Sequence, residues 1–213
     1  MRLSDLEARL GRRFARVTTN VVVARPRLWR GFRWLMQAQF ERLAPVWDSM
    51  RRPEAFAALE RALEALPAAP RRVLDLGTGT GLAAFVAARR FPEAAVVGVD
   101  LAPGMIDQAR RSTPPELAER VGFQQADAVR LPFEDGAFDL VQLANMIPFF
   151  DEVTRVTAPG GHVVLSFSAG PETPIWVPPD RLRRELAAHG FTDFAEFEAE
   201  GGTALLARKA DHL

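Results

Sequence analysis

The feature that most constrains the fold of this chain is a glycine-rich stretch, VLDLGTGTGLAAFVA, at residues 73–87. An apolar run precedes the glycines and an alanine-rich run follows them, which is the pattern of a buried strand, a tight loop and a helix. Glycine lets the backbone turn tightly and lets a ligand approach without obstruction by side chains. The stretch therefore predicts a site for a nucleotide-like ligand where a strand meets a helix.

From residue 71 onward, short apolar runs alternate with helical patterns. We expect strands over 71–77, 94–100, 121–127, 138–145 and 162–168, with a short helix and turn over 151–161. The runs 192–200 and 203–209 are joined by two glycines, which indicates a closing hairpin. This alternation predicts an α/β fold, a Rossmann-like doubly wound sheet of seven strands, mostly parallel with an antiparallel C-terminal hairpin strand.

The first 68 residues have a different pattern and predict an N-terminal helical cap, followed by the main domain over 69–213. Helices are expected over 3–17, 26–43 and 53–66, with a break over 18–26 because three consecutive valines favour extended structure. The second helix has one continuous apolar face, formed by Trp29, Phe32, Met36, Phe40 and Leu43 and widened by Leu28 and Leu35.

Charge is distributed unevenly along a chain whose formal net charge is zero. Residues 1–52 carry a net charge of +8 and the remainder −8. A basic segment of this kind favours either docking on the acidic body or contact with an anionic surface. The chain has no cysteine, which excludes disulfides and thiolate chemistry, and the start lacks a signal peptide pattern, which favours a cytoplasmic location.

Two acidic residues distinguish between the ligands that such a loop can bind. Residues 79–84, GTGLAA, fit the alanine variant of a dinucleotide loop, so an NAD(P)-dependent oxidoreductase stays open as an alternative. Asp75 lies immediately before the glycines, where it would repel a pyrophosphate and attract a cationic ligand. Asp100 ends the second strand, the position from which an α/β fold holds a ribose diol.

Taken together and in this order, the motifs resemble those of the class I S-adenosylmethionine (SAM)-dependent methyltransferases of the small-molecule type. The matching segments are VLDLGTGTG, VVGVDLAPGMIDQAR, ADAVRLPFEDGAFDLV, RVTAPGGHVVLSF and LAAHGFTDF, which cover roughly residues 71–209. The resemblance implies a SAM cofactor, with S-adenosylhomocysteine as product. It implies cofactor-binding roles for Asp75, Gly77, Thr78, Gly79, Gly81, Asp100, Leu101, Met105, Asp127, Ala128 and Asn145.

Within that resemblance each acidic residue has a separate role. Asp75 would lie near the methionine amino group, Asp100 would accept hydrogen bonds from the ribose hydroxyls, and Asp127 would receive the adenine amino group. Leu101, Met105 and the backbone of Ala128 would surround the adenine ring.

The acceptor site is expected in two segments. The loop after the fourth strand offers an apolar mouth, and FERLAPVWD at residues 40–48 resembles a segment of quinone-type methyltransferases that would place a tryptophan over the cofactor. The substrate residues expected from these segments are Trp47, Met146, Phe149 and Phe150.

No catalytic base and no metal site are predicted. The chain has no tyrosine, and His162 and His189 have structural explanations at a strand start and a helix end. The expected reaction is in-line methyl transfer to a small, apolar or lipid-like acceptor. A non-catalytic SAM-binding regulatory or partner protein is the remaining alternative.

The basic N-terminal segment has two open interpretations, a lid over the site and a reversible contact with an anionic membrane. Nucleic acid is disfavoured as a partner because the body is acidic, and the sequence assigns no oligomeric state.

Overall fold

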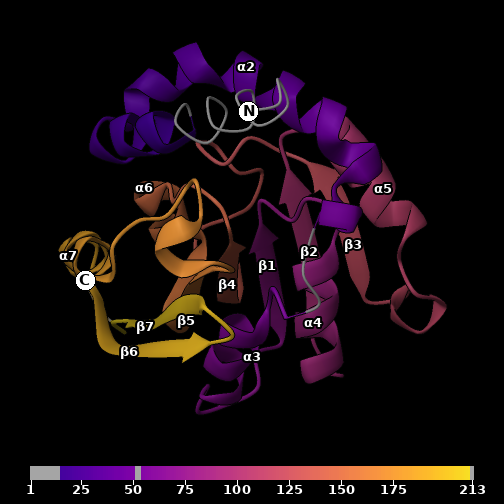
Figure 1. The fold of residues 1–213 in the computed structure, drawn as a ribbon. Coiled ribbons are helices and arrows are strands. Elements are labelled where there is room, and N and C mark those ends of the chain that lie inside the picture. The colour runs from indigo at the N-terminus through magenta and orange to yellow at the C-terminus, as the bar shows by residue number, and fades with distance from the viewer. Residues whose placement is uncertain (1–14, 51–53, 212–213) are drawn as a thin grey trace.

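A computed structural model describes residues 15–50 and 54–211 of the chain, and Figure 1 shows the arrangement. A seven-stranded sheet has the order β3-β2-β1-β4-β5-β7-β6. The first five strands pair in parallel, and β7 pairs antiparallel with both β5 and β6. The strands are β1 (Arg72–Leu76), β2 (Ala95–Asp100), β3 (Val121–Gln125), β4 (Phe138–Ala144), β5 (Thr157–Phe167), β6 (Phe191–Ala199) and β7 (Gly202–Lys209). The predicted fold class is confirmed.

Helices cover both faces of the sheet, and one further helix lies across the carboxyl ends of the parallel strands. The helices are α2 (Trp29–Leu43), α3 (Ala57–Glu64), α4 (Leu82–Arg90), α5 (Pro103–Arg111), α6 (Phe150–Val156) and α7 (Pro179–Ala188). One hydrophobic cluster joins α3, α4 and α5 to the sheet, and a second joins α6 and α7 to the other face. In Figure 1, α2 crosses the end of the sheet at which β1 points.

Alternation along β1 explains why the strand is buried on both faces. The side chain of Val73 enters the cluster under α3 and α4, whereas those of Leu74 and Leu76 enter the opposite cluster. Successive side chains of a strand point to opposite faces, so a run of apolar residues suits a sheet that is covered on both sides. The glycine loop therefore starts from a strand that packing holds in place.

The expected break over residues 18–26 is wrong. Residues 15–24 form a continuous helix through all three valines, with Val22 0% and Val23 6% exposed. The low helix propensity of valine costs only a few tenths of a kcal/mol per residue, and burial of two valines outweighs it. The helix ends at Arg25, before Pro26, and the part of the expected first helix before residue 15 lies outside the described residues.

Of the short helix and turn expected over 151–161, the helix is present as α6, but the turn is replaced by the start of the fifth strand. It begins at Thr157, which pairs with Phe138 of β4, and the register shifts before Leu140 pairs with His162. Gly160 takes a φ of +71° in this irregular segment. A bulge accommodates proline and glycine without ending the strand, which is why a turn-like sequence lies within β5.

Two of the helices expected within residues 1–68, those that correspond to α2 and α3, do not lie together. α3 packs against β5, β6 and β7, whereas α2 contacts α5 near the opposite edge. The division of the chain at residue 68 stays a prediction.

A partly buried ion pair holds the loop that leads into β4. Glu152 accepts hydrogen bonds from the Arg155 guanidinium at 2.8 Å and from the Leu131 backbone N–H at 2.7 Å. Arg155 also donates to the carbonyl of Phe133 at 2.7 Å. These bonds connect α6 to residues 131–133 of the loop between β3 and β4.

We expect Glu152→Gln to lower the free energy of unfolding by about 1–2 kcal/mol at pH 7. Hydrogen bonding from Arg155 lowers the pKa of Glu152, so its contribution is present above the ordinary glutamate pKa and is lost as pH falls through the lower folded value. Urea unfolding at pH 7 and below pH 4 measures this. A difference between wild type and variant that stays constant over that range would contradict the assignment.

Candidate functional site

A cavity lies between α2 and the carboxyl ends of β1, β2 and β4. Its empty volume is about 770 Å³, including the space at its mouth that is open to solvent. Such a position, at the carboxyl ends of parallel strands, is where open α/β sheets bind their ligands. The wall is formed by Trp29, Met36, Phe40, Trp47, Leu76, Gly77, Gly79, Val99, Asp100, Leu101, Met105, Ala126, Ala128, Ala144, Asn145, Met146, Ile147, Phe149 and Ile175.

The glycine loop forms the floor of the cavity in left-handed backbone geometry. Gly77 has φ +72°, Gly79 has φ +55° and Gly81 has φ +88°. A Cβ placed on Gly77 would lie 2.1 Å from the sulfur of Met146. The backbone therefore approaches the facing side chain more closely than any residue other than glycine allows.

Asp100 brings a carboxylate to the cavity at the end of β2. One oxygen accepts the N–H of Gly79 at 3.0 Å and the other accepts the N–H of Ala102 at 2.9 Å. Burial raises the pKa of Asp100, and these backbone hydrogen bonds oppose the shift. Each carboxylate oxygen can accept a second hydrogen bond, so the group retains capacity for hydroxyl donors.

Asp75 does not reach the cavity wall. It is 1% exposed, and its carboxylate accepts the hydroxyl of Thr78 at 2.5 Å and the amide of Gln142 at 3.0 Å. Gln142 lies opposite Asp75 in the register of β4 and also donates to the carbonyl of Ala83 at 2.9 Å. Within this structure, Asp75 holds the glycine loop from behind, and its expected contact with a methionine amino group stays a prediction.

Asp127 is held by the helix that roofs the cavity. Its carboxylate accepts the indole N–H of Trp29 at 3.0 Å and forms an ion pair with Arg33 at 3.0 Å. The ion pair between Arg33 and Asp127 joins the basic N-terminal segment to the acidic body. This contact agrees with the interpretation of that segment as a lid over the site. An adenine amino group at Asp127 would share or displace these donors.

The other expected cofactor residues divide into two groups. Leu101, Met105, Ala128 and Asn145 line the cavity, whereas Thr78 and Gly81 lie outside the wall. Asn145 takes a φ of +55°, and its side-chain oxygen accepts the N–H of Ser168 at 2.9 Å. Asparagine tolerates the left-handed region better than most residues, so this strained position is compatible with the chain turning out of β4.

Of the expected acceptor residues, Trp47, Met146 and Phe149 line the cavity and Phe150 does not. Phe150 is 6% exposed and packs against the His189 ring at a centroid distance of 5.8 Å. It begins α6 and points into the core, so the expectation that it forms the mouth is not met.

The sequence reasoning missed wall residues that come from distant segments. Trp29, Met36 and Phe40 come from α2, and Ile175 comes from the segment before α7. The apolar face of α2 could be recognised in the sequence, but the sequence did not show that this face covers the cavity. No sequence pattern marked Ile175 as a wall residue, because only the tertiary fold brings its loop to the cavity.

The comparisons with known proteins agree with this geometry. Residues 73–161 match the model of a methyltransferase domain family. The chain therefore contains a class I SAM-dependent methyltransferase domain.

Individual relatives of this methyltransferase domain carry more specific names. A demethylmenaquinone methyltransferase of Thermus thermophilus is 44% identical over 146 residues, which is 62% of this chain and 66% of that protein. A malonyl-[acyl-carrier protein] O-methyltransferase of Halorhodospira halophila is 40% identical over 148 residues, 65% of this chain and 49% of that protein. The chain thus spans between about half and two-thirds of the length of these curated relatives.

Solved structures support the fold. A chain of the complex between the Haloferax volcanii Trm112 methyltransferase activator and a methyltransferase superposes with a TM-score of 0.66 at 19% identity. The match covers 80% of this chain and 97% of that one. At this level of identity the likeness supports the fold alone.

The residues present fit the SAM that the family implies. Gly77, Gly79 and the carboxylate of Asp100 line a hollow whose remaining wall is mostly apolar, which suits a ribose flanked by an adenine and a methionine chain. Asp100 is the one ionisable side chain in this wall as far as the described residues form it. In the same part of the chain, no cluster of potential metal ligands occurs, and no helix is long and apolar enough to cross a membrane.

Proposed function

We propose that the chain transfers the methyl group of SAM to a small, apolar acceptor. The observation that supports this most directly is the composition of the cavity wall, where one carboxylate and a glycine loop face apolar and aromatic side chains. The carboxylate suits the hydroxyls of a ribose, and the aromatic side chains suit an acceptor of low polarity.

The proposed roles follow from position. Asp100 accepts hydrogen bonds from the ribose hydroxyls, while Leu101, Met105 and Ala128 pack around the adenine. Gly77 and Gly79 leave room for the methionine portion. Asp75 acts through the loop, because its carboxylate is bonded to Thr78 and Gln142 behind it.

The acceptor side of the cavity is formed by aromatic and sulfur-containing side chains. Trp29, Trp47 and Phe149 line it, and the rings of Trp29 and Phe149 meet edge to face at 5.3 Å between centroids. SAM when bound supplies a methyl group that is already electrophilic, so the protein must align the acceptor and exclude water. A wall with these rings excludes water but offers no general base.

The acceptor is therefore a molecule that is nucleophilic at neutral pH without a protein base, such as a hydroquinone, through an electron-rich ring carbon, or an acidic enol. The relative from Thermus thermophilus, a demethylmenaquinone methyltransferase, has a name that indicates a quinone-type substrate and supports this substrate class. The relative named for a malonyl-carrier substrate keeps a carboxylate acceptor as the second candidate.

Two measurements test the proposal. Isothermal titration calorimetry with S-adenosylhomocysteine and with NAD distinguishes the cofactors, and binding of NAD alone would refute the proposal. Mass spectrometry after incubation with SAM and reduced quinones or short-chain acyl acids then detects the methylated product. Binding of S-adenosylhomocysteine without methylation of any acceptor would support the non-catalytic alternative instead.

Removal of the ion pair between α2 and Asp127 is expected to speed cofactor entry. Because Arg33 is half exposed, Arg33→Gln should change stability little, yet it frees one oxygen of Asp127 and loosens the roof. We expect S-adenosylhomocysteine to associate about two- to fivefold faster, since the open state becomes more populated. Stopped-flow tryptophan fluorescence measures the rate, and Arg30→Gln, on the outer side of the same helix, is the control that should leave it unchanged.

A further inference from the structure

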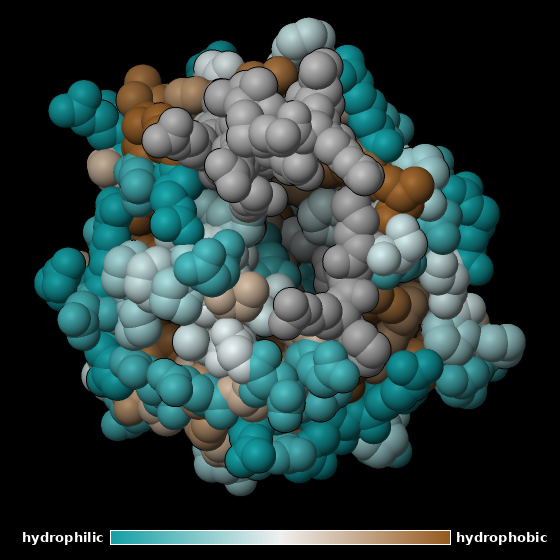
Figure 2. All heavy atoms as spheres, in the orientation of Figure 1, coloured by the Kyte–Doolittle hydropathy of each residue, from teal (hydrophilic) through white to brown (hydrophobic). Residues whose placement is uncertain are grey.

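Apolar side chains that are largely exposed gather in one segment of the described chain. Among the described residues, every large hydrophobic side chain classed as exposed lies between residues 15 and 50: Val17 59%, Leu28 45%, Trp34 77%, Leu35 45% and Val46 49%. Figure 2 shows brown atoms along the upper edge of the molecule, where α2 lies in Figure 1. Scattered exposed apolar residues are normal, but their restriction to one segment indicates an interaction surface.

α2 has two apolar faces. Its inner face buries Trp29 and Met36, which line the cavity. Its outer face presents Trp34 to solvent, opposite the buried Met36. Leu35 and Leu28, the last residue of the preceding 3-10 helix, are seven residues apart and share a neighbouring exposed side, about 100° around the helix from Trp34. Leu28 and Leu35, which the sequence analysis added to the border of the inner face, are each 45% exposed and belong to none of the hydrophobic core clusters of the described residues.

Arginines flank this outer face. Arg25, Arg27, Arg30 and Arg42 are exposed, and within the described part of the chain none of them has an ion-pair partner. The net charge of residues 1–52 is +8, against −8 for the rest of the chain. The outer face therefore combines apolar side chains with a local positive charge that the fold does not use.

We propose that the outer face of α2 docks on the surface of an anionic lipid bilayer. Leucine and tryptophan side chains enter the boundary between headgroups and acyl chains, and the arginines are attracted to the anionic headgroups. Exposed apolar side chains beside arginines without an ion-pair partner in the described chain suit the surface of an anionic bilayer, where apolar and charged groups lie close together. The acidic body of the protein disfavours a nucleic acid.

This placement brings the roof of the cavity to the membrane. α2 separates the cavity from the bilayer by one helix, so an apolar acceptor could pass from the lipid into the cavity beside it. That second step rests on the proposed methyl transfer, whereas docking does not.

The test compares vesicle binding of variants of the full chain. Sedimentation with vesicles of phosphatidylcholine containing about a third phosphatidylglycerol, and with phosphatidylcholine alone, measures partitioning. We expect strong binding to the anionic vesicles only, and a loss of at least about tenfold for Trp34→Ser/Leu35→Ser and for Arg27→Glu/Arg30→Glu. Circular dichroism melting verifies that these exposed substitutions leave the fold intact.

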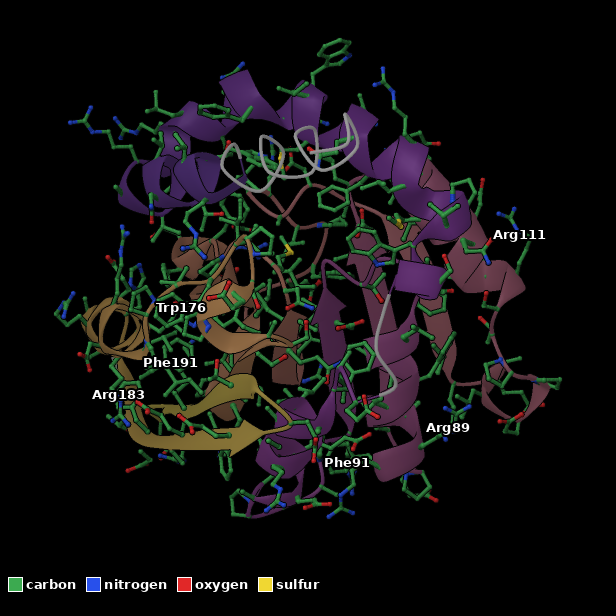
Figure 3. The ribbon with its side chains drawn as sticks, in the orientation of Figure 1. Arg89, Phe91, Arg111, Trp176, Arg183 and Phe191 are labelled. Atoms are coloured by element: carbon green, nitrogen blue, oxygen red, sulfur yellow. The ribbon has the colours of Figure 1, made fainter. Side chains whose placement is uncertain are left out.

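A matched control distinguishes the effect of positive charge beside α2 from the effect of the net charge of the whole protein on vesicle binding. Arg61→Glu/Arg89→Glu changes the net charge by the same amount, and Figure 3 shows Arg89 at the end of the molecule away from α2. Arg61 and Arg89 are both exposed, on α3 and α4. This variant should retain most of the binding, and equal losses for both charge-reversal variants would overturn the proposal.

Two further outcomes would overturn the docking proposal. One is a wild-type chain that fails to sediment with anionic vesicles. The other is a dimer, by light scattering, that Trp34→Ser/Leu35→Ser converts to a monomer, because a second copy would then cover the face. S-adenosylhomocysteine binding measured without vesicles reports separately on the proposed function, so failure of one proposal is distinguishable from failure of the other.

Discussion

Replacement of Gly77 by alanine is expected to weaken S-adenosylhomocysteine binding by about 100-fold. Gly77 has a φ of +72°, which costs an alanine about 1–2 kcal/mol. The new Cβ would also lie 2.1 Å from the sulfur of Met146, so either the loop or that side chain must move. Both movements change the floor of the cavity at the position we assign to the methionine portion of SAM.

Two controls separate the contributions. Met146→Ala/Gly77→Ala removes the clash but keeps the backbone strain, so it should regain part of the lost affinity in calorimetry. Gly201→Ala carries the same type of strain, since its φ is +77°, but a Cβ there meets nothing within 4 Å. Gly201→Ala should lower the melting temperature slightly and leave binding unchanged. Wild-type affinity for Gly77→Ala would mean that the ligand does not lie against this loop.

The fold was predictable where local pattern and packing agree. β1 and β2 are short apolar runs that end at glycine or aspartate, and parallel strands covered on both faces require such runs. The valines at 21–23 show the opposite case, because a helix that buries Val22 and Val23 overrides a local preference for extended structure. The sequence pattern contains the preference but not the surface that outweighs it.

The site was predictable where its residues follow the ends of strands. Gly77, Asp100 and Asn145 are found in this way, because the carboxyl ends of parallel strands meet at one edge. The Asp127 contact with Trp29 was not predictable, since the two residues are 98 positions apart in sequence. Only the docking of α2 on the sheet edge brings them together, and no local pattern specifies that docking.

Asp100→Ala is expected to weaken S-adenosylhomocysteine binding by about 1.5–3 kcal/mol, or roughly 10- to 150-fold. The variant removes the carboxylate that we assign to the ribose hydroxyls and leaves the N–H groups of Gly79 and Ala102 without their acceptor. Asp107→Ala is the matched control, because that carboxylate is 59% exposed on the neighbouring helix α5. Equal affinities for Asp100→Ala and wild type would refute the assignment.

The pH dependence of S-adenosylhomocysteine binding distinguishes the contribution of the negative charge of Asp100 from that of the size and shape of its side chain. Burial raises the pKa of Asp100, so in the unliganded protein the carboxylate gains its proton at a higher pH than an exposed aspartate does. Hydroxyl donors bind the ionised form more strongly, so wild-type affinity should fall as pH decreases through that raised pKa. Asp100→Asn has a similar size and no charge, and calorimetry over the same range should give a weaker affinity that does not change with pH. A variant whose affinity decreases in parallel with that of the wild type would assign the titration to another group.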